Sequence, residues 1–216
     1  MVTELGQQFS VMSDWIREIR DISLQRDRMR FRRNIERIGE IAAFEISKHL
    51  AYEEITVQTP MGEATCFQLT EQPVLATILR AGIPLHHGLL NYFDKADNAF
   101  IAAYRKHHRD GSFEIDQQYI TSPGIDGRPL IVADPMLASG SSVVLALETL
   151  TESEKPSQIH VVTVIACTVG IELIKRKFPD AYIWAAAVDE ELTARGYIVP
   201  GLGDAGDLAY GSKMQA

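Results

Sequence analysis

The residue types best able to do chemistry are concentrated at positions 134–142, where an aspartate, three serines and a glycine occur in the segment DPMLASGSS. The four residues before this segment are apolar and include β-branched side chains, which predicts a buried strand. Pro135 lacks a backbone donor and is expected to end the sheet pairing of that strand. Apolar residues at helical spacing follow over 143–150, with Ser141 or Ser142 as the expected N-cap.

Such a strand–turn–helix unit is suited to binding an anion. The first amides of a helix lack intrahelical partners, and the helix dipole adds roughly half a positive charge there. The hydroxyls of Ser139, Ser141 and Ser142 could donate further hydrogen bonds, and Gly140 would let a phosphate approach the backbone. The carboxylate of Asp134 suits sugar hydroxyls, a developing cation or Mg²⁺ better than a second phosphate. Taken alone, the segment could also be an ordinary turn with a capping serine.

The elements that must position this segment follow a strand-then-helix pattern over the second half of the chain. This alternation predicts an α/β fold with a parallel sheet of about five strands and helices on both faces. Helices are expected at 86–90, 143–150 and 170–178. The expected strands are the apolar runs 74–79, 99–104, 130–134, 159–167 and 181–188.

Ligands of open parallel sheets bind at the carboxyl ends of the strands. Arg80 and Arg105 follow the first two predicted strands, and Asp134 ends the third. Each hydrogen bond from an arginine to a phosphate contributes roughly 1.5–3 kcal/mol. Two arginines would therefore outweigh the helix dipole, which contributes at most about 2 kcal/mol. The alternative for either arginine alone is a surface ion pair.

The rest of the chain is expected to form accessory parts of the same domain. Residues 1–50 form an N-terminal helical segment with helical periodicity over 13–50, and residues 51–216 form the core. A hairpin with a solvated face is predicted over 54–68. Residues from about 105 to 129 are expected to form a β-hairpin flap that excludes water from the site, with Asp110-Gly111 as its turn. His107 and His108 in this flap are candidate metal ligands or acid–base groups, or simply solvated residues.

Composition limits the classes of function. The formal net charge of −8 argues against a nucleic-acid binder, and the arginines between 25 and 33 are interspersed with acids, which favours a solvated helix face or subunit contact. Cys66 and Cys167 have no zinc-site spacing. No apolar run is long enough to cross a membrane, and we expect a cytoplasmic protein.

A glycine-rich stretch near the end of the chain, 196–207, offers exposed backbone N–H and C=O groups that could read the edge of a flat heterocycle. Gly201, Gly203 and Gly206 match the dinucleotide-binding fingerprint GxGxxG. That fingerprint needs a full helix and a second strand after it, and only ten residues follow Gly206. We therefore reject a dinucleotide site here.

The segments 134–142 and 196–207 together resemble those of uracil phosphoribosyltransferases, and the resemblance extends from about residue 38 to residue 211. Arg80 and Arg105 fall where the family places its arginines. The chain departs from the family pattern in three places: Ser139-Gly-Ser141 stands for Thr-Gly-Gly, Lys106-His-His-Arg109 for acidic residues, and Leu208-Ala-Tyr-Gly211 for a basic residue with Phe-Gly.

The resemblance implies transfer of the phosphoribosyl group of 5-phosphoribosyl 1-diphosphate (PRPP) to uracil, which gives UMP and diphosphate in pyrimidine salvage. It also implies Mg²⁺ held mainly through PRPP, a homo-oligomer (dimer or tetramer), and GTP as a candidate effector. The residues implied in catalysis are Asp134, Arg105 and Asp204. Those implied in PRPP binding are Arg80, Arg105, Asp134, Pro135, Met136, Leu137, Ala138, Ser139, Gly140, Ser141, Ser142 and Asp204. Those implied in uracil binding are Ile198, Gly203, Asp204 and Ala205.

Three alternatives stay open: a regulatory RNA-binding protein on the same fold, a phosphoribosyltransferase for another base, and a catalytically silent paralogue. The acidic net charge disfavours the first, the Gly203-Asp-Ala205 match disfavours the second, and the departures from the family pattern raise the third.

Overall fold

The computed structural model describes the backbone of residues 1–107 and 113–212, and no side chain from 103 to 118 is described. Its main sheet has the order β1-β10-β9-β7-β4-β5-β6, and a short β8 also pairs with β9. All pairings are parallel except that of β6 with β5. The strands are β1 (Val2–Glu4), β4 (Val74–Leu79), β5 (Asp97–His107), β6 (Phe113–Thr121), β7 (Pro129–Ala133), β8 (Met136–Leu137), β9 (Gln158–Cys167) and β10 (Tyr182–Asp189).

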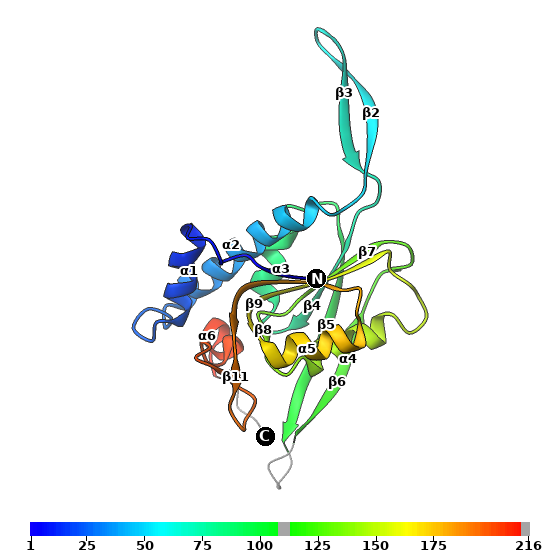
Figure 1. Ribbon diagram of the computed structural model, residues 1–216. Coiled ribbons are helices and arrows are strands. Elements are labelled where there is room, and N and C mark those ends of the chain that lie inside the picture. The colour runs from blue at the N-terminus through cyan, green and yellow to red at the C-terminus, as the bar shows by residue number, and fades with distance from the viewer. Residues whose placement is uncertain (108–112, 213–216) are drawn as a thin grey trace.

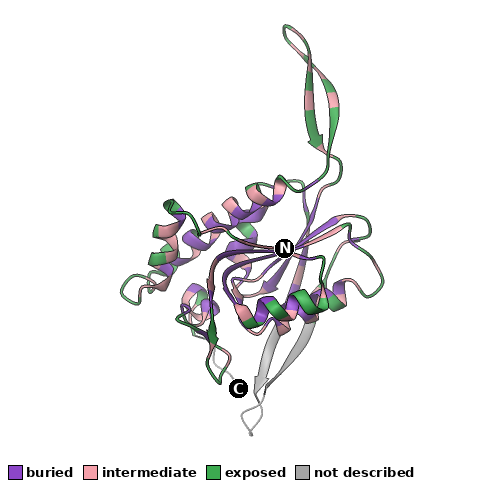
Figure 2. Ribbon diagram, in the orientation of Figure 1, coloured by how far each residue is buried: buried purple, intermediate pink, exposed green. Residues whose placement is uncertain are grey.

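Helices cover both faces of this sheet, which confirms the predicted α/β class (Figure 1). One hydrophobic cluster joins one face to α1, α2, α3 and α6, and a second joins the other face to α4 and α5. The central strands are buried on both faces, as uniformly apolar runs require (Figure 2). The helices are α1 (Val11–Arg20), α2 (Arg28–Ser47), α3 (Ile83–Leu90), α4 (Ser141–Leu150), α5 (Thr168–Lys177) and α6 (Ala205–Tyr210).

The N-terminal helical segment differs from the prediction in being interrupted. Helix α1 starts after Ser10, which forms a capping box with Ser13, and it ends at Arg20. Helix α2 starts after Asp27, whose side chain accepts a hydrogen bond from the Arg30 amide. Asp and Ser side chains favour such caps over helix interiors, so the intervening turn breaks the helical pattern that the apolar periodicity indicated.

Two features at the sheet were not predicted correctly. Strand β1 pairs with β10 at the edge of the sheet, although its three residues show no periodicity. Pairing does not end at Pro135: the Pro135 carbonyl accepts hydrogen bonds from the amides of Val164 and Ile165, and β8 resumes the pairing with β9. Proline lacks only the donor, so its carbonyl can still take part in the ladder.

The predicted flap is built on two long strands. Strand β5 continues past residue 104 to His107, because β6 pairs with it antiparallel over this length. The strands extend beyond the body of the sheet at its carboxyl edge (Figure 1). The predicted turn at Asp110-Gly111 and His108 lie outside the described residues.

The predicted N-terminal hairpin is confirmed as β2 (Tyr52–Thr59) and β3 (Gly62–Leu69), and it projects away from the body as an arm (Figure 1). No residue of either strand is buried (Figure 2). One face carries the cross-strand pairs Ile55–Cys66 and Val57–Ala64, which are only half-buried. An isolated two-stranded hairpin is marginally stable in water, so this arm lacks a covering layer within the described chain.

A buried aromatic cluster lies under α2, next to the amino ends of β9 and β10. Trp184 donates its Nε1–H to Nδ1 of His160 at 3.1 Å, and the other ring nitrogen of His160 lies 3.0 Å from Oε1 of Gln158. The His160 ring stacks on Tyr182. Burial, with a smaller contribution from His49, lowers the pKa of His160 from 6.5 to about 4. His86 in α3 has its pKa lowered to about 4, mainly by burial.

These histidines predict a loss of stability in mild acid. In the unfolded chain these two histidines are protonated near pH 6.5, whereas in the folded chain they are protonated only near pH 4. The contribution of these histidines to the free energy of unfolding should be complete above pH 6.5. The free energy of unfolding should then fall by up to roughly 3 kcal/mol per histidine as the pH drops to 4. Urea unfolding at several pH values checks this. His160→Gln should flatten the pH dependence by about half. An equal slope in wild type and His160→Gln would contradict this prediction.

Among the described residues, no helix is both long and apolar enough to span a bilayer.

Candidate functional site

Three neighbouring parallel strands deliver the predicted PRPP-binding residues to one edge of the sheet. Strand β4 lies between β5 and β7 and pairs in parallel with both. Arg80 follows the last residue of β4, and Asp134 follows the last residue of β7. The backbone of Arg105 lies in the extended part of β5, opposite Ile115 of β6. The Arg105 side chain is outside the described residues, so only its position along the strand is known.

The turn after β7 differs from the prediction in its cap. The N-cap of α4 is Gly140, not Ser141 or Ser142, and its φ of 82° lies in the left-handed region that glycine adopts readily. No side chain caps this helix. The Ser139 hydroxyl lies 3.1 Å from that of Ser141. The expected helix N-terminus is therefore present, with backbone amides that have no intrahelical partner.

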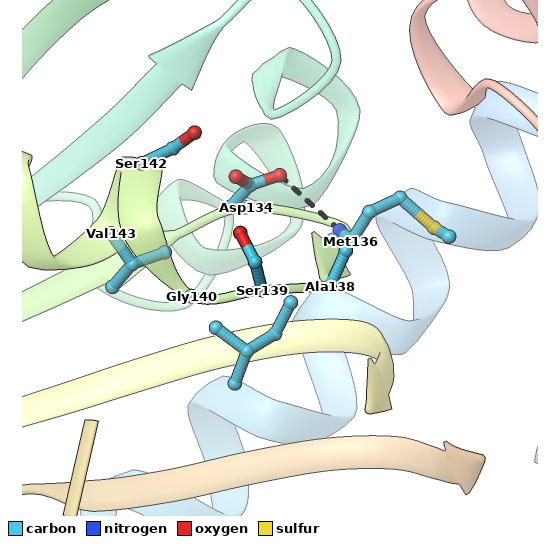
Figure 3. A pocket seen from close by; sticks show the side chains of 8 residues that line it. Asp134, Met136, Ala138, Ser139, Gly140, Ser142 and Val143 are labelled. Carbon is cyan, nitrogen blue, oxygen red and sulfur yellow. Dashed lines mark hydrogen bonds between the residues drawn. The ribbon is translucent and has the colours of Figure 1, made fainter. Parts of the chain in front are cut away.

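A small pocket lies directly over this turn (Figure 3). The Asp134 carboxylate lies beside it and accepts a hydrogen bond from the Met136 amide at 3.2 Å. The hydroxyls of Ser139 and Ser142 lie on the same side of the loop as this carboxylate (Figure 3). A negative group, several hydroxyls and a helix N-terminus thus border one hollow. The lining residues are Asp134, Met136, Leu137, Ala138, Ser139, Gly140, Ser142 and Val143.

The shape of this loop is fixed from below by the neighbouring strand and helix. The buried Thr163 of β9 accepts a hydrogen bond from the Leu137 amide at 3.1 Å. A side chain at Gly170, at the start of α5, would come within 2.6 Å of the Ala138 carbonyl oxygen. A Cβ on Gly140 would come within 3.0 Å of the Gly170 carbonyl oxygen. The two backbones therefore approach more closely than residues with side chains would allow.

Arg80 is bound to the C-terminal segment. Its Nη2 donates to the Asp207 carboxylate and to the Gly211 carbonyl, both at 2.7 Å. The two charged side chains are each about one-third exposed. Arg80 therefore links the loop after β4 to the segment predicted to read uracil, a connection that the spacing in the sequence did not indicate.

The glycine-rich stretch forms a second turn and a short helix. Strand β12 (Ile198–Val199) pairs antiparallel with β11 (Glu191–Leu192). Ile198 and Ala205, predicted for uracil binding, are buried, whereas a Cβ on Gly203 would meet nothing within 4 Å. Asp204 is the N-cap of α6, and its carboxylate accepts a hydrogen bond from the Asp207 amide at 2.9 Å. Asp204 thus shapes this segment as well as lying in it.

Residues of the N-terminal segment support this stretch, and sequence reasoning did not find them. Arg20 of α1 donates to the Asp189 carboxylate and to the Gly201 carbonyl. Gln25 donates to the Leu202 carbonyl at 3.2 Å. These contacts join residues that are more than 160 positions apart, and no local pattern could have revealed them.

The turn 138–142 and the N-terminus of α4 form a surface suited to an anion, which we call the anion cradle. This edge of the sheet thus combines the anion cradle, the Asp134 carboxylate and a loop that presents backbone groups. No group of three or more histidine, cysteine, aspartate or glutamate side chains gathers into a metal-binding cluster in the part of the chain that is described. Asp134 is a single hard carboxylate next to the cradle. This donor set fits a Mg²⁺ ion that is held largely by oxygens of a phosphorylated ligand.

The fold is shared with solved phosphoribosyltransferases. A hypoxanthine phosphoribosyltransferase from Staphylococcus aureus superimposes with a TM-score of 0.50 at 15% identity and covers 86% of this chain and 84% of its own. A protein from Aquifex aeolicus gives a TM-score of 0.88 at 29% identity, with both chains covered completely. The chain therefore has the α/β fold that phosphoribosyltransferases adopt.

The sequence comparisons are more specific. The family model of uracil phosphoribosyltransferase matches residues 8–212. A uracil phosphoribosyltransferase from Porphyromonas gingivalis is 50% identical over 214 residues, which is 99% of this chain and 99% of that protein. The chain belongs to the uracil phosphoribosyltransferase family, as the two sequence segments predicted.

Proposed function

We propose that this chain transfers the phosphoribosyl group of PRPP to the ring nitrogen of uracil, which yields UMP and diphosphate. One observation carries the proposal: the anion cradle after β7 and the glycine-rich loop around Gly203 are held at the same edge of the sheet, linked by Arg80 through Asp207. The anion cradle is suited to a phosphate, and the glycine-rich loop is suited to a flat base. Family membership names the base as uracil.

The charges at this edge match the charge that develops in the reaction. Breaking the bond from the ribose to diphosphate leaves positive charge on the ribose and extra negative charge on the leaving group. In this proposal the α4 N-terminus and serine hydroxyls bind the 5′-phosphate, and the Asp134 carboxylate lies by the ribose. Arg80 and Arg105 bind diphosphate, and backbone groups of Ile198 and Gly203–Ala205 read uracil. None of these roles requires a covalent nucleophile.

Magnesium is part of this proposal as a partner of the substrate. When bound, Mg²⁺ would neutralise part of the diphosphate charge as it leaves. Asp134 would be the protein carboxylate nearest to it, and the remaining ligands would be oxygens of PRPP and water. Removing divalent metal with a chelator should then abolish turnover without unfolding the protein.

The test is direct. Purified protein is incubated with PRPP, Mg²⁺ and one base at a time, and the nucleotide product is identified by chromatography. UMP from uracil alone is the expected result. A nucleotide formed from a different base would support a phosphoribosyltransferase for that base. The absence of any product under every metal condition would support a catalytically silent paralogue. In a filter-binding assay, binding of pyrimidine-operon RNA that weakens steeply with added salt would support the RNA-binding alternative.

Two further expectations stay predictions. GTP as an effector, which the resemblance implies, is tested by adding it to the same assay. A cytoplasmic location is in keeping with the two cysteines, Cys66 and Cys167, which are both free thiols.

We also propose a homo-oligomer in which a second copy covers the β2–β3 arm. The arm carries half-buried Ile55 and Val57 on one face and exposed polar residues such as Thr56 on the other. Met61 at its tip is 96% exposed. A second copy would complete the layer that a two-stranded hairpin needs, and would bury this apolar face.

The arm gives a matched pair of variants. Ile55→Asp, on the apolar face, should shift the protein to monomer in analytical ultracentrifugation. Thr56→Asp, on the opposite face of the same strand, should leave the oligomer intact because that side chain is already exposed. A wild-type monomer at micromolar concentration, or the same mass for both variants, would contradict the proposed role of the arm.

A further inference from the structure

A loop that reads a base with its backbone groups must be held rigidly. Hydrogen-bond donors and acceptors discriminate between ligands only if their positions are fixed before the ligand binds. Glycine-rich backbone is intrinsically flexible, and the stretch around Gly201 and Gly203 has few side chains of its own to fix it. Other parts of the chain must therefore provide the rigidity.

The structure contains such a device at Gly201. The Asp189 carboxylate, at the end of β10, accepts a hydrogen bond from the Gly201 amide at 2.9 Å. Arg20 binds both oxygens of that carboxylate at 2.8 Å and also donates to the Gly201 carbonyl at 2.9 Å. Both backbone groups of one glycine are thus held by a single ion pair. We call Arg20 and Asp189 the loop clamp.

The clamp is largely removed from water. The side chain of Asp189 is 7% exposed and that of Arg20 is 22% exposed, so solvent screens their attraction much less than at a surface ion pair. The planar guanidinium group can make the two parallel bonds to a carboxylate that an ammonium group cannot make. Gln25 adds a hydrogen bond to the carbonyl of Leu202, the next residue in the loop.

The loop passes so close to Ile198 that only a glycine fits at position 201. Gly201 has a φ of 55°, and a Cβ built on it would come within 2.2 Å of the Ile198 carbonyl oxygen. The clamped residue therefore packs directly on one of the residues proposed to bind uracil. It also lies two residues before Gly203, where the proposed site is open. A shift of Gly201 would move both sides of the base site.

We infer that Arg20 and Asp189 are positioning residues for uracil recognition: they hold the backbone at Gly201 so that Ile198 and Gly203–Ala205 present their groups to the base. This inference rests on the proposed function and extends it to α1, which contributes no residue to the proposed substrate contacts. Neither side chain needs to touch uracil or PRPP.

The same helix offers a matched control. Arg30 of α2 makes a paired contact of the same kind with Glu18 of α1, with distances of 2.8 and 2.7 Å, and it does not reach the loop. Arg30→Ala therefore removes an arginine–carboxylate pair between secondary-structure elements without touching Gly201. Any effect that both variants share is structural, and any effect confined to Arg20→Ala belongs to the clamp.

The experiment measures steady-state kinetics and amide hydrogen exchange on the full-length protein. Arg20→Ala should raise the KM for uracil about 10- to 100-fold, because small misplacements of binding groups have effects of that size, and should change the KM for PRPP by less than about threefold. Amides between residues 201 and 208 should exchange faster, whereas those of β7 and β9 should not. Arg20→Lys should recover part of the loss, and Arg30→Ala should match the wild type in both measurements.

Several outcomes would overturn the inference. Unchanged exchange at residues 201–208 in Arg20→Ala would show that the clamp does not hold the loop. Equal increases in the KM for uracil and for PRPP in Arg20→Ala would show that the clamp is only a general structural contact. An increase of the same size in the KM for uracil in Arg30→Ala would show the same. If the wild-type protein forms no UMP, the proposed function and the role in uracil recognition fail together, while the exchange data still report whether the clamp holds the loop.

Discussion

Replacing Arg80 with alanine is expected to lower kcat/KM for PRPP about 100-fold or more, because it would remove the charge-assisted hydrogen bonds that we propose Arg80 makes to the departing diphosphate. The KM for uracil should rise less. Steady-state kinetics with each substrate varied in turn would measure both effects. Arg80 sits directly after β4 at the edge where β7 delivers the anion cradle, and this position motivates the prediction.

The contact between Arg80 and Asp207 supplies the control for this prediction. Asp207→Ala removes the carboxylate that binds Arg80 but leaves the guanidinium group in place. If Arg80 binds diphosphate, its loss should raise the KM for PRPP well beyond the loss of Asp207. If Arg80 serves only to hold the C-terminal segment, the two variants should be equally impaired, and the proposed diphosphate role would be wrong.

Replacing Asp134 with asparagine is expected to lower kcat about 100- to 1,000-fold with little change in the KM for uracil, because it would remove the negative charge that we propose lies beside the developing ribose cation. An asparagine side-chain oxygen can still accept the hydrogen bond that Asp134 accepts from the Met136 amide. The loop should therefore keep its shape, and the loss should report the charge alone.

Asp134→Ala completes this test, since it removes both the charge and the hydrogen bond to the loop. It should be at least as impaired as Asp134→Asn and should also bind PRPP more weakly. Circular dichroism and thermal unfolding would verify that both variants fold. An asparagine variant with near wild-type kcat would contradict electrostatic stabilisation by this residue.

The sequence allowed the five core strands to be predicted because buried parallel strands read as continuous apolar runs. It also indicated the turn at 134–142, where strand, small residues and helix follow each other directly. The GxGxxG match at Gly201 was rightly rejected, since α6 has only six residues and no strand follows it in the described part of the chain. In these places local chemistry determines the structure.

Local patterns failed where distant residues decide. Strand β1 is recognisable only through its pairing with β10, and β6 is a continuous strand only because β5 lies opposite. Gly140 rather than a serine caps α4, because the turn packs so closely on Gly170. The contacts of Arg80 with Asp207 and of Arg20 with Gly201 join residues 127 and 181 positions apart, and no periodicity or spacing in the sequence indicates them.

The loop clamp has a consequence for how the protein is made. During synthesis on the ribosome, Arg20 emerges long before Gly201. The contact between Arg20 of α1 and the Gly201 carbonyl can therefore form only after residue 201 has been added and has emerged. A polypeptide truncated after β10 would keep both Arg20 and Asp189 and yet would lack the loop that this pair holds. The strands of the main sheet all lie within residues 2–189, so the sheet does not include this loop, whereas the loop itself depends on contacts with the first helix.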